Sequence, residues 1–304
     1  MKKIAYLVSA VTAAAFSSAH ADISVSGAAN VNYHSAGSNT QVVNGGSIAF
    51  SLSTTTDSGM TISSGAGITA DTDGYGAAGI TGMTSITLAS GGVSITIGED
   101  VGIADGVGEV GDIVTYADYN ANAPTTSTAV GDDEGNGITL STSMGDATVA
   151  ATYVFDGGAA GDLDGATKTS TSVKVTMPVG GLTITGAYAS SDDNGTVNNE
   201  SAISAAYAAA GGTLTLGYTS TDGDTASSNG TGAGVKYAMD LDGTSITVGY
   251  QSYDTNATSS ITDIIVSRSL GGGASVFAEM RSVSGTTSGG SDNNSMAIGT
   301  SVSF

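Results

Sequence analysis

The chain has 304 residues, of which only 12% are charged, and its composition differs from that of a typical soluble enzyme. It holds 46 Gly, 2 Pro, no Cys and no Trp, with a formal net charge of −21. Without Cys it can form neither a disulfide framework nor a thiolate metal site. Because so acidic a chain is repelled by phosphate groups, nucleic acid is excluded as a partner.

The first 21 residues have the features of an export signal. Lys2 and Lys3 give a charged start, residues 4–16 are mainly apolar, and Ala19-His20-Ala21 is a small-residue cleavage site. The apolar run is shorter than the roughly 20 residues that a spanning helix needs. We therefore expect a cleaved signal peptide over 1–21 and a single domain over 22–304. Loss of the two lysines would bring the net charge from −21 to −23.

From Asp22 onward the dominant sequence period is two. Apolar residues or glycine alternate with Ser, Thr and Asn, an arrangement that puts the two sets on opposite faces of a strand. The last strands are less regular around Ile264 and Val266. The pattern predicts sixteen strands with alternation over 23–33, 48–52, 60–62, 86–88, 93–97, 138–140, 149–155, 173–177, 182–188, 203–207, 214–218, 235–239, 246–250, 264–266, 276–280 and 296–304.

The connections between these strands alternate in length. Segments rich in Asp, Asn, Gly, Ser and Thr follow the odd-numbered strands, and short turns follow the even-numbered ones, at 54–59, 89–92, 143–147, 178–181, 208–212, 240–243 and 270–273. Such alternation is typical of membrane barrels. Because an unpaired backbone group costs several kcal/mol in hydrocarbon, a lipid-facing sheet has to close. We predict an all-β fold, a closed antiparallel transmembrane β-barrel of about 16 strands with a water-filled lumen.

Aromatic residues give a separate indication. They gather near the ends of the expected strands, in one set with Tyr33, Tyr153, Phe155, Tyr188, Tyr218 and Tyr250 and another with Tyr207, Tyr237 and Phe304. In a barrel these sets would form belts at the two membrane interfaces, where amphipathic rings are favoured. The alternative is aromatic residues scattered over ordinary strands.

These features together resemble the Gram-negative general porins, and most closely the alphaproteobacterial type. The resemblance covers 22–304, and its most specific part is the terminal strand from Asn294 to Phe304. It implies a homotrimer in the cell outer membrane, in contact with lipid, that passes small hydrophilic solutes and ions by passive diffusion. In that family the terminal strand ends in an aromatic residue, which resembles the signal that the barrel assembly machinery reads. The resemblance implies the same role for Phe304.

The family also folds a long loop after the fifth strand into the barrel to narrow the pore. The matching segment here is 98–135, which we call the acidic segment. Its carboxylates inside a low-dielectric wall would focus a negative potential and enrich cations. The alternative is a solvated surface loop whose acids only aid solubility. The resemblance thus implies a pore constriction with Glu99, Asp100, Asp105, Glu109 and Asp112 as its acids.

The few basic residues fit the same arrangement. A base on the lipid face at the bilayer midplane costs about 2–4 kcal/mol, so the lumen is the favoured place. Lys174, Lys236 and Arg281 each lie out of phase with the apolar set, whereas Arg268 is in the irregular strand. General porins place a basic cluster on the wall opposite the acidic loop, which implies Lys174, Lys236, Arg268 and Arg281 as candidate pore-wall bases.

Other functions have less support. Acid pairs such as Asp162/Asp164 can hold Ca²⁺ on flexible loops, and a secreted acidic Ca²⁺-binding adhesin or surface-layer β-solenoid shares this composition. A solenoid should have a fixed internal period, which the sequence lacks. After signal cleavage only His34 remains, in the first long loop, so a catalytic base and nucleophile are hard to assemble. We expect no enzyme and no cofactor apart from any loop-bound Ca²⁺.

Overall fold

The computed structural model describes residues 21–36, 39–71, 79–99, 107, 110, 136–156, 168–193, 196–224, 229–254, 258–285 and 293–304. Residues 1–20 of the expected signal peptide lie outside them, and its last residue, Ala21, begins the first strand. The strands are β1 (Ala21–Ala36), β2 (Asn39–Thr55), β3 (Thr61–Asp71), β4 (Gly79–Thr81), β5 (Ser85–Ser90), β6 (Val93–Gly98), β7 (Asn136–Met144), β8 (Ala147–Asp156), β9 (Lys168–Val179), β10 (Leu182–Asp193), β11 (Thr196–Ala209), β12 (Gly212–Gly223), β13 (Gly230–Leu241), β14 (Thr244–Asp254), β15 (Thr258–Gly271), β16 (Ala274–Gly285) and β17 (Asn293–Ser303).

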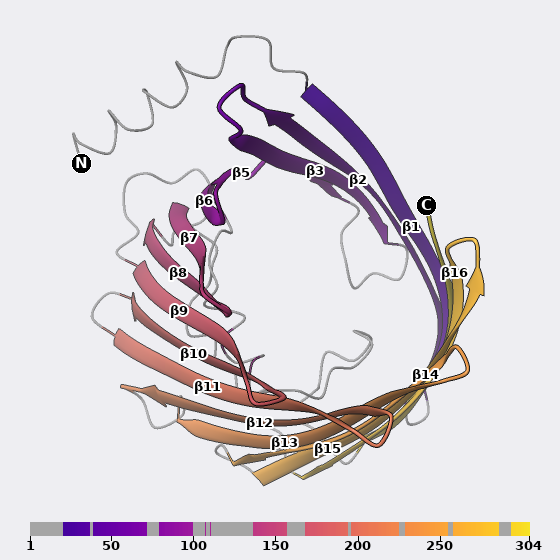
Figure 1. Ribbon diagram of the computed structural model, residues 1–304. Helices are drawn as coiled ribbons and strands as arrows, with labels where there is room; N and C mark the ends of the chain where they lie inside the picture. Colours follow the sequence, from indigo (N-terminus) through magenta and orange to yellow (C-terminus); the bar gives the residue numbers. More distant parts are fainter. Residues whose placement is uncertain are drawn as a thin grey trace.

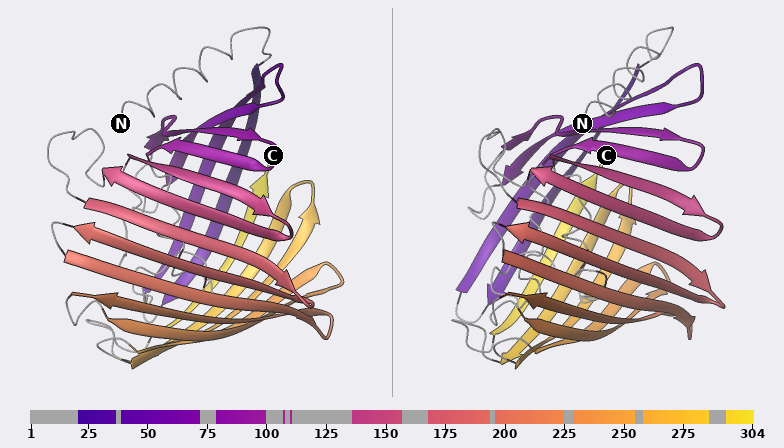
Figure 2. Two further views of the ribbon diagram at one scale, coloured as in Figure 1. Left: turned by 60° about the vertical axis from the view of Figure 1, so that its left-hand side comes forward. Right: turned by 90° about the vertical axis from the view of Figure 1, so that its left-hand side faces the viewer.

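These strands form one closed antiparallel sheet, drawn end-on in Figure 1 and from the side in Figure 2. Both β4 and β5 pair with β3, so that together they make the fourth of sixteen barrel strands. The ring closes where β17 pairs with β1, from Ala28 opposite Ser303 to Ala36 opposite Ser295. The predicted all-β, sixteen-stranded barrel is confirmed, and the β-solenoid alternative loses its support.

Alternation along each strand sorts the side chains into an outer and an inner face. On β9, Val173, Val175 and Met177 point outward and are exposed, whereas Ser170 and Ser172 point inward and are buried. The neighbouring strands repeat this arrangement in register: Tyr188 of β10 lies outside, opposite Val173. Large apolar residues are therefore exposed on the outside, the reverse of a soluble sandwich and the expected pattern for a barrel surrounded by lipid.

Tight turns join the strands at one end of the barrel. The β5–β6 turn has Gly91 and Gly92 at φ +59° and +83°, the left-handed pair that a two-residue type I′ hairpin requires. Asp242 (φ +54°) occupies an equivalent left-handed position before Gly243 in the β13–β14 turn. All seven short turns are found where the sequence predicts them.

The expected long connections at the other end are shorter than predicted, and two of them shrink to two residues each. Strand β1 continues to Ala36 and β2 begins at Asn39, so His34 lies within a strand and not in a long loop. Strands β10 and β11 likewise extend to Asp193 and Thr196. These extensions are rich in Ser, Asn and Asp, and they lack the apolar alternation by which the strands were recognised. The connection after β6, the fifth barrel strand, is long, as predicted.

The aromatic side chains of the two expected belts lie on the outer face. Tyr153, Tyr188, Tyr218 and Tyr250 are exposed there, as are Tyr207 and Phe304. Near the short turns, the Tyr237 hydroxyl lies 3.1 Å from the carbonyl oxygen of Ala209 and 3.0 Å from that of Ala210, to which it donates. Each tyrosine ring thus combines an apolar body with a hydroxyl at the strand end. Among the described residues, no helix is both long and apolar enough to cross a bilayer.

Candidate functional site

The inner face of the barrel is lined mainly by hydroxyl groups. Pairs of them bridge adjacent strands, with oxygen–oxygen distances of 2.8 Å for Thr87–Thr96, 2.7 Å for Thr139–Thr152, 3.1 Å for Thr176–Thr185 and 2.7 Å for Ser275–Ser301. Such cross-strand pairs stabilise a sheet modestly. They also give the lumen a neutral, water-compatible surface, which a channel for hydrophilic molecules needs.

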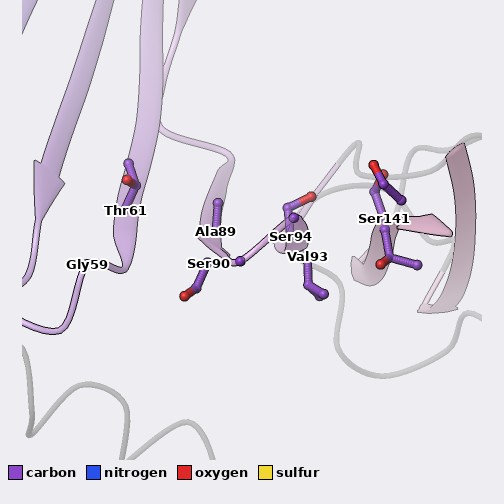
Figure 3. A pocket seen from close by; sticks show the side chains of 11 residues that line it. Gly59, Thr61, Ala89, Ser90, Val93, Ser94 and Ser141 are labelled. Carbon is purple, nitrogen blue, oxygen red and sulfur yellow. The ribbon is translucent and has the colours of Figure 1, made fainter. Parts of the chain in front are cut away.

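A recess of about 400 Å³ opens beside the short turns of β2–β3, β5–β6 and β7–β8 (Figure 3). Thr61, Ala89, Ser94 and Ser141 line it from four strands, and no charged residue is among its lining. The recess continues the hydroxyl-rich inner surface to this end of the barrel.

Two lysines lie on the inner wall and are half-buried. Lys174 of β9 alternates with the exposed Val173 and Val175, and its register partner on β10 is the inward-facing Ala187. Lys236 of β13 lies opposite Thr215 of β12 and Gly249 of β14. The structure therefore places both on the face that the sequence indicates, on separate strands of the same wall.

Arg268 is on the outer face, so it does not join the inner-wall bases. It alternates in phase with Val266 and Leu270, which are exposed, and its guanidinium Nη1 donates to Thr244 Oγ1 at 3.2 Å. The position is close to the β15–β16 turn, where the cost of a lipid-facing base falls to about 0–1 kcal/mol. Its long side chain can also reach the water layer. The irregular apolar run Ile264-Ile265-Val266 obscured this phase in the sequence.

Arg281 faces inward but is buried within a group of charged residues. Its register partner on β15 is Asp263, and Asp263 also shares a side-chain hydrogen bond with Glu279. The guanidinium acts electrostatically on Asp263 and on His34 of β1. All four side chains are nearly inaccessible. We call them the buried charge cluster. Because acids surround it, Arg281 adds little positive potential to the lumen.

Sequence reasoning missed several inward-facing charged or polar residues. Glu200 of β11 is only 2% exposed, with Ala189 and Thr221 as its register neighbours. Asp263 was hidden by the apolar residues beside it, and His34 and Glu200 by the expectation of loops there. The strand alternation could have revealed Glu200. It lies two residues before Ala202, on the same face of the strand, whereas Ile203 lies on the other face.

The acidic segment is described only in part. At its start Gly98 has φ +153°, and an added Cβ would meet the Thr84 carbonyl oxygen and Ser85. The next residue, Glu99, is half-buried, and its backbone N–H donates to Thr84 O at 2.9 Å. Asp100, Asp105, Glu109 and Asp112 lie outside the described residues, as does the acid pair Asp162/Asp164. Loop-bound Ca²⁺ therefore stays a prediction. In the described part of the chain, no group of three or more acidic or histidine side chains could hold a metal ion.

Two valines of the acidic segment contact the inner wall. Val107 is fully buried against Ala187 and Ala189 of β10 and Ala202 of β11, and Val110 packs on the same group. These alanines alternate with the outward-facing Tyr188 and Ile203. The contact is therefore inside the barrel.

The chain ends at the barrel seam. Phe304 exchanges two backbone hydrogen bonds with Gly27 of β1, each 3.0 Å from nitrogen to oxygen. Its ring lies on the outer face over Gly27. The residue thus completes the pairing of the last strand with the first.

A closed barrel with an apolar exterior and a hydroxyl-lined interior is a membrane-spanning channel. The family model for Gram-negative porins matches residues 8–288. The chain therefore belongs to the Gram-negative porin family and is an outer-membrane porin channel, which confirms the resemblance seen in the sequence.

Solved porin structures share the fold. A loop-deletion mutant of the outer membrane protein OmpT of Vibrio cholerae superposes with a TM-score of 0.73 at 14% identity, covering 93% of this chain and 99% of that chain. An A104W-containing mutant of Rhodobacter blastica porin gives 0.71 at 20% identity, covering 93% and 100%. In vitro folded OmpT, described in a trimer form, gives 0.73 at 12% identity, covering 93% and 99%. None of the curated proteins matches the chain.

Proposed function

We propose that the protein is a homotrimeric porin that passes small hydrophilic solutes and ions by passive diffusion, with a preference for cations. The observation that carries the proposal is the inner wall, where hydroxyl groups paired across strands face the lumen of a closed barrel. A surface of this kind exchanges hydrogen bonds with water and solutes without strong, specific binding, as a diffusion channel requires.

The balance of charge supports the cation preference. The chain has 28 acidic and 7 basic residues, two of the latter in the expected signal peptide. Of the inward-facing bases described, Arg281 lies among Asp263 and Glu279, which leaves Lys174 and Lys236 half-buried on the wall. Against these, the acidic segment contributes Glu99, Asp100, Asp105, Glu109 and Asp112. A negative potential in a narrow lumen concentrates cations.

The constriction is supported by one contact. Val107 belongs to the acidic segment and is buried on the inward-facing Ala187 and Ala189. Val107 and Val110 occupy part of the lumen at this point, and this supports a constriction formed by the acidic segment. The family membership of the chain agrees with this arrangement.

Export, assembly and trimerisation complete the proposal. Cleavage before Asp22 would release the mature chain into the periplasm, and Phe304 at the end of the last strand would then be recognised by the barrel assembly machinery. The trimer form of OmpT, which has the same fold, supports a trimer. Amino-terminal sequencing of the mature protein should begin at Asp22, and a heat-labile band of three subunits should appear on gels in SDS.

The test of the pore is conductance in planar bilayers. The refolded protein should insert in discrete conductance steps, and the reversal potential in a KCl gradient should have the sign of a cation-preferring pore. Absence of steps would remove the channel, and an anion-selective reversal potential would remove the cation preference while leaving the channel intact.

A variant addresses the acidic segment directly. Changing Glu99→Gln together with Asp105→Asn, Glu109→Gln and Asp112→Asn should weaken the cation preference, because four negative charges are lost from the constriction. The control is Asp146→Asn with Asp242→Asn, which removes two charges at exposed turns away from the acidic segment. If both variants leave the reversal potential unchanged, the acidic segment does not line the ion path.

A further inference from the structure

The aromatic side chains of the described strands face lipid, with the exceptions of Tyr253 and Phe277. Tyr253 of β14 is only 2% exposed, since it packs with Ile261 and Val283. Phe277 of β16 is partly exposed, and it alternates in phase with the inward-facing Glu279. An apolar ring in contact with the water of a lumen is unfavourable. Phe277 therefore differs from the hydroxyl-lined wall around it.

The ring of Phe277 lies against bare backbone at the barrel seam. Its register partner on β17 is Gly299, where an added Cβ would come within 2.5 Å of Phe277 Cε1 and would also meet the side-chain oxygen of Asn32. Asn32 of β1 is the register partner of Gly299 on the other side. Aromatic side chains that cover a glycine in this way help to fix the pairing of strands. The ring is thus held on the wall, and its exposed part is accessible from the lumen.

Polar, uncharged side chains surround the ring. Ser267 of β15 is its other register partner, and Ser275 lies two residues before it on the same face. Ser275 Oγ is 2.7 Å from Ser301 Oγ of β17, and Asn30 of β1 is the register partner of Ser301. All four polar side chains are half-buried. We call Phe277 and these four neighbours the lumen platform.

Two kinds of solute can use an aromatic ring of this kind. Organic cations bind to the ring face through its quadrupole, and molecules with a flat apolar face stack on it. The nearest acid on the strand, Glu279, is 5% exposed and shares a hydrogen bond with Asp263 in the buried charge cluster. It is not accessible to a cation bound on Phe277. A pyranose sugar has an apolar face of C–H groups and a rim of hydroxyl groups, which match the ring and its polar neighbours.

We propose that the lumen platform is a weak binding site for pyranose sugars, which stack on Phe277 and form hydrogen bonds with the polar neighbours. The inference rests on the proposed function, because it names a solute class for the same channel. One stacked ring and a few hydrogen bonds contribute a factor of about ten or less each, so the dissociation constant should be millimolar or weaker. At lower sugar concentrations the site stays mostly empty, and flux remains proportional to the concentration difference.

A tryptophan reporter tests the site directly. The chain has no Trp, so Phe277→Trp places a single indole on the platform. Maltose should change its fluorescence in a saturable way in the refolded protein, whereas sorbitol, which has hydroxyl groups but no ring, should not. The control is Phe50→Trp on β2, which faces lipid beside the exposed Val25.

The titration can also contradict the proposal. The absence of a saturable response to maltose, or the same response from both reporters, would reject the platform. A saturable response to tetramethylammonium chloride without one to maltose would reject the sugar and assign the ring to organic cations.

Removing the ring tests the site without a reporter. In planar bilayers, maltose should lower the KCl conductance of the unmodified protein more than sorbitol does at equal viscosity, and Phe277→Ala should abolish this difference. Tyr250→Ala is the matched control, because it removes a ring from the lipid face and should leave the difference intact. A difference that persists in Phe277→Ala would reject the platform.

The two proposals fail separately. Stepwise conductance without any specific effect of maltose would retain the channel and reject the platform. If no conductance is found, the channel is rejected, and the fluorescence titration of the refolded protein still decides whether the platform binds sugar. Folding of each variant is checked by the heat-dependent shift in gel mobility that a closed barrel shows.

Discussion

The ring of Phe304 occupies the space where any other residue at position 27 would have its Cβ. A methyl group built on Gly27 would come within 2.5 Å of Phe304 Cζ and 2.9 Å of the Ser47 carbonyl oxygen. Glycine in a strand weakens it unless a neighbour covers the backbone, and here the terminal ring provides that cover. Gly27 and Phe304 are therefore complementary parts of the seam between β1 and β17.

Gly27→Ala should loosen this seam. The added methyl overlaps the ring and the backbone of β2, and overpacking of this kind costs about 1–3 kcal/mol. The measurement is the denaturant midpoint of the refolded barrel, followed by the gel shift on heating. Gly186→Ala is the matched control, since a methyl there has open space on the same outer face. Equal midpoints for the two variants would contradict the overlap.

Replacing Arg268 should leave ion selectivity unaltered. The side chain is outside the barrel, near the turn that follows β15, and its contact is with Thr244. Arg268→Ala is expected to change stability by less than about 1 kcal/mol, as for other exposed positions near the interface. A changed reversal potential in a KCl gradient would mean that the guanidinium faces the lumen after all.

Replacing Arg281 should be far more damaging. Arg281→Met leaves Asp263 and Glu279 buried without the cation that lies beside them, and breaking a buried charge pair in this way costs about 3–5 kcal/mol. The loss is read from the denaturant midpoint. Adding Asp263→Asn to the same chain should recover part of it, because one buried charge is removed. No recovery in the double variant would argue against electrostatic coupling between these two residues.

Lys174→Gln and Lys236→Gln should each strengthen the proposed cation preference. One unit charge acting through water at about 10 Å contributes about 0.4 kcal/mol, or roughly twofold in ion concentration, at low salt. The reversal potential should thus shift toward the cation limit, and the shift should shrink at 1 M KCl, where charges are screened beyond about 3 Å. Unchanged selectivity for both variants would place the lysines off the ion path.

The sequence allowed the barrel to be predicted because lipid and water impose opposite demands on alternate residues. Val173, Val175 and Tyr188 had to face outward, and tight turns at positions such as Gly91 and Gly92 had to carry glycine. These constraints are local, so the strand count and the short turns could be derived from one chain. The strand ends could not be derived in this way, because beyond the bilayer both faces of a strand meet water. The apolar alternation that marks the middle of β1 and β11 therefore does not extend to the end of β1 at Ala36 or to the start of β11 at Thr196.

The inner wall was less predictable because its contacts join residues far apart in sequence. Whether the charge of Arg281 affects the potential in the lumen depends on its neighbours Asp263 and His34, which belong to β15 and β1. Ala187 and Ala189 pack against Val107, and the need for glycine at position 27 depends on Phe304. Arg268 is a different case. Arg268 lies two residues after Val266, so the two share one face of the strand, but the three consecutive apolar residues 264–266 obscured the alternation.

The hydroxyl pairs of the inner wall have a consequence for transport speed. Thr87 with Thr96, and Thr139 with Thr152, already satisfy one another at 2.8 and 2.7 Å. A hydrophilic solute in this lumen would therefore meet hydroxyl groups that are already partly engaged, and it could form only weak, short-lived hydrogen bonds with them. Residence times along such a surface should be brief and similar from place to place, so that flux rises in proportion to the concentration difference and does not saturate.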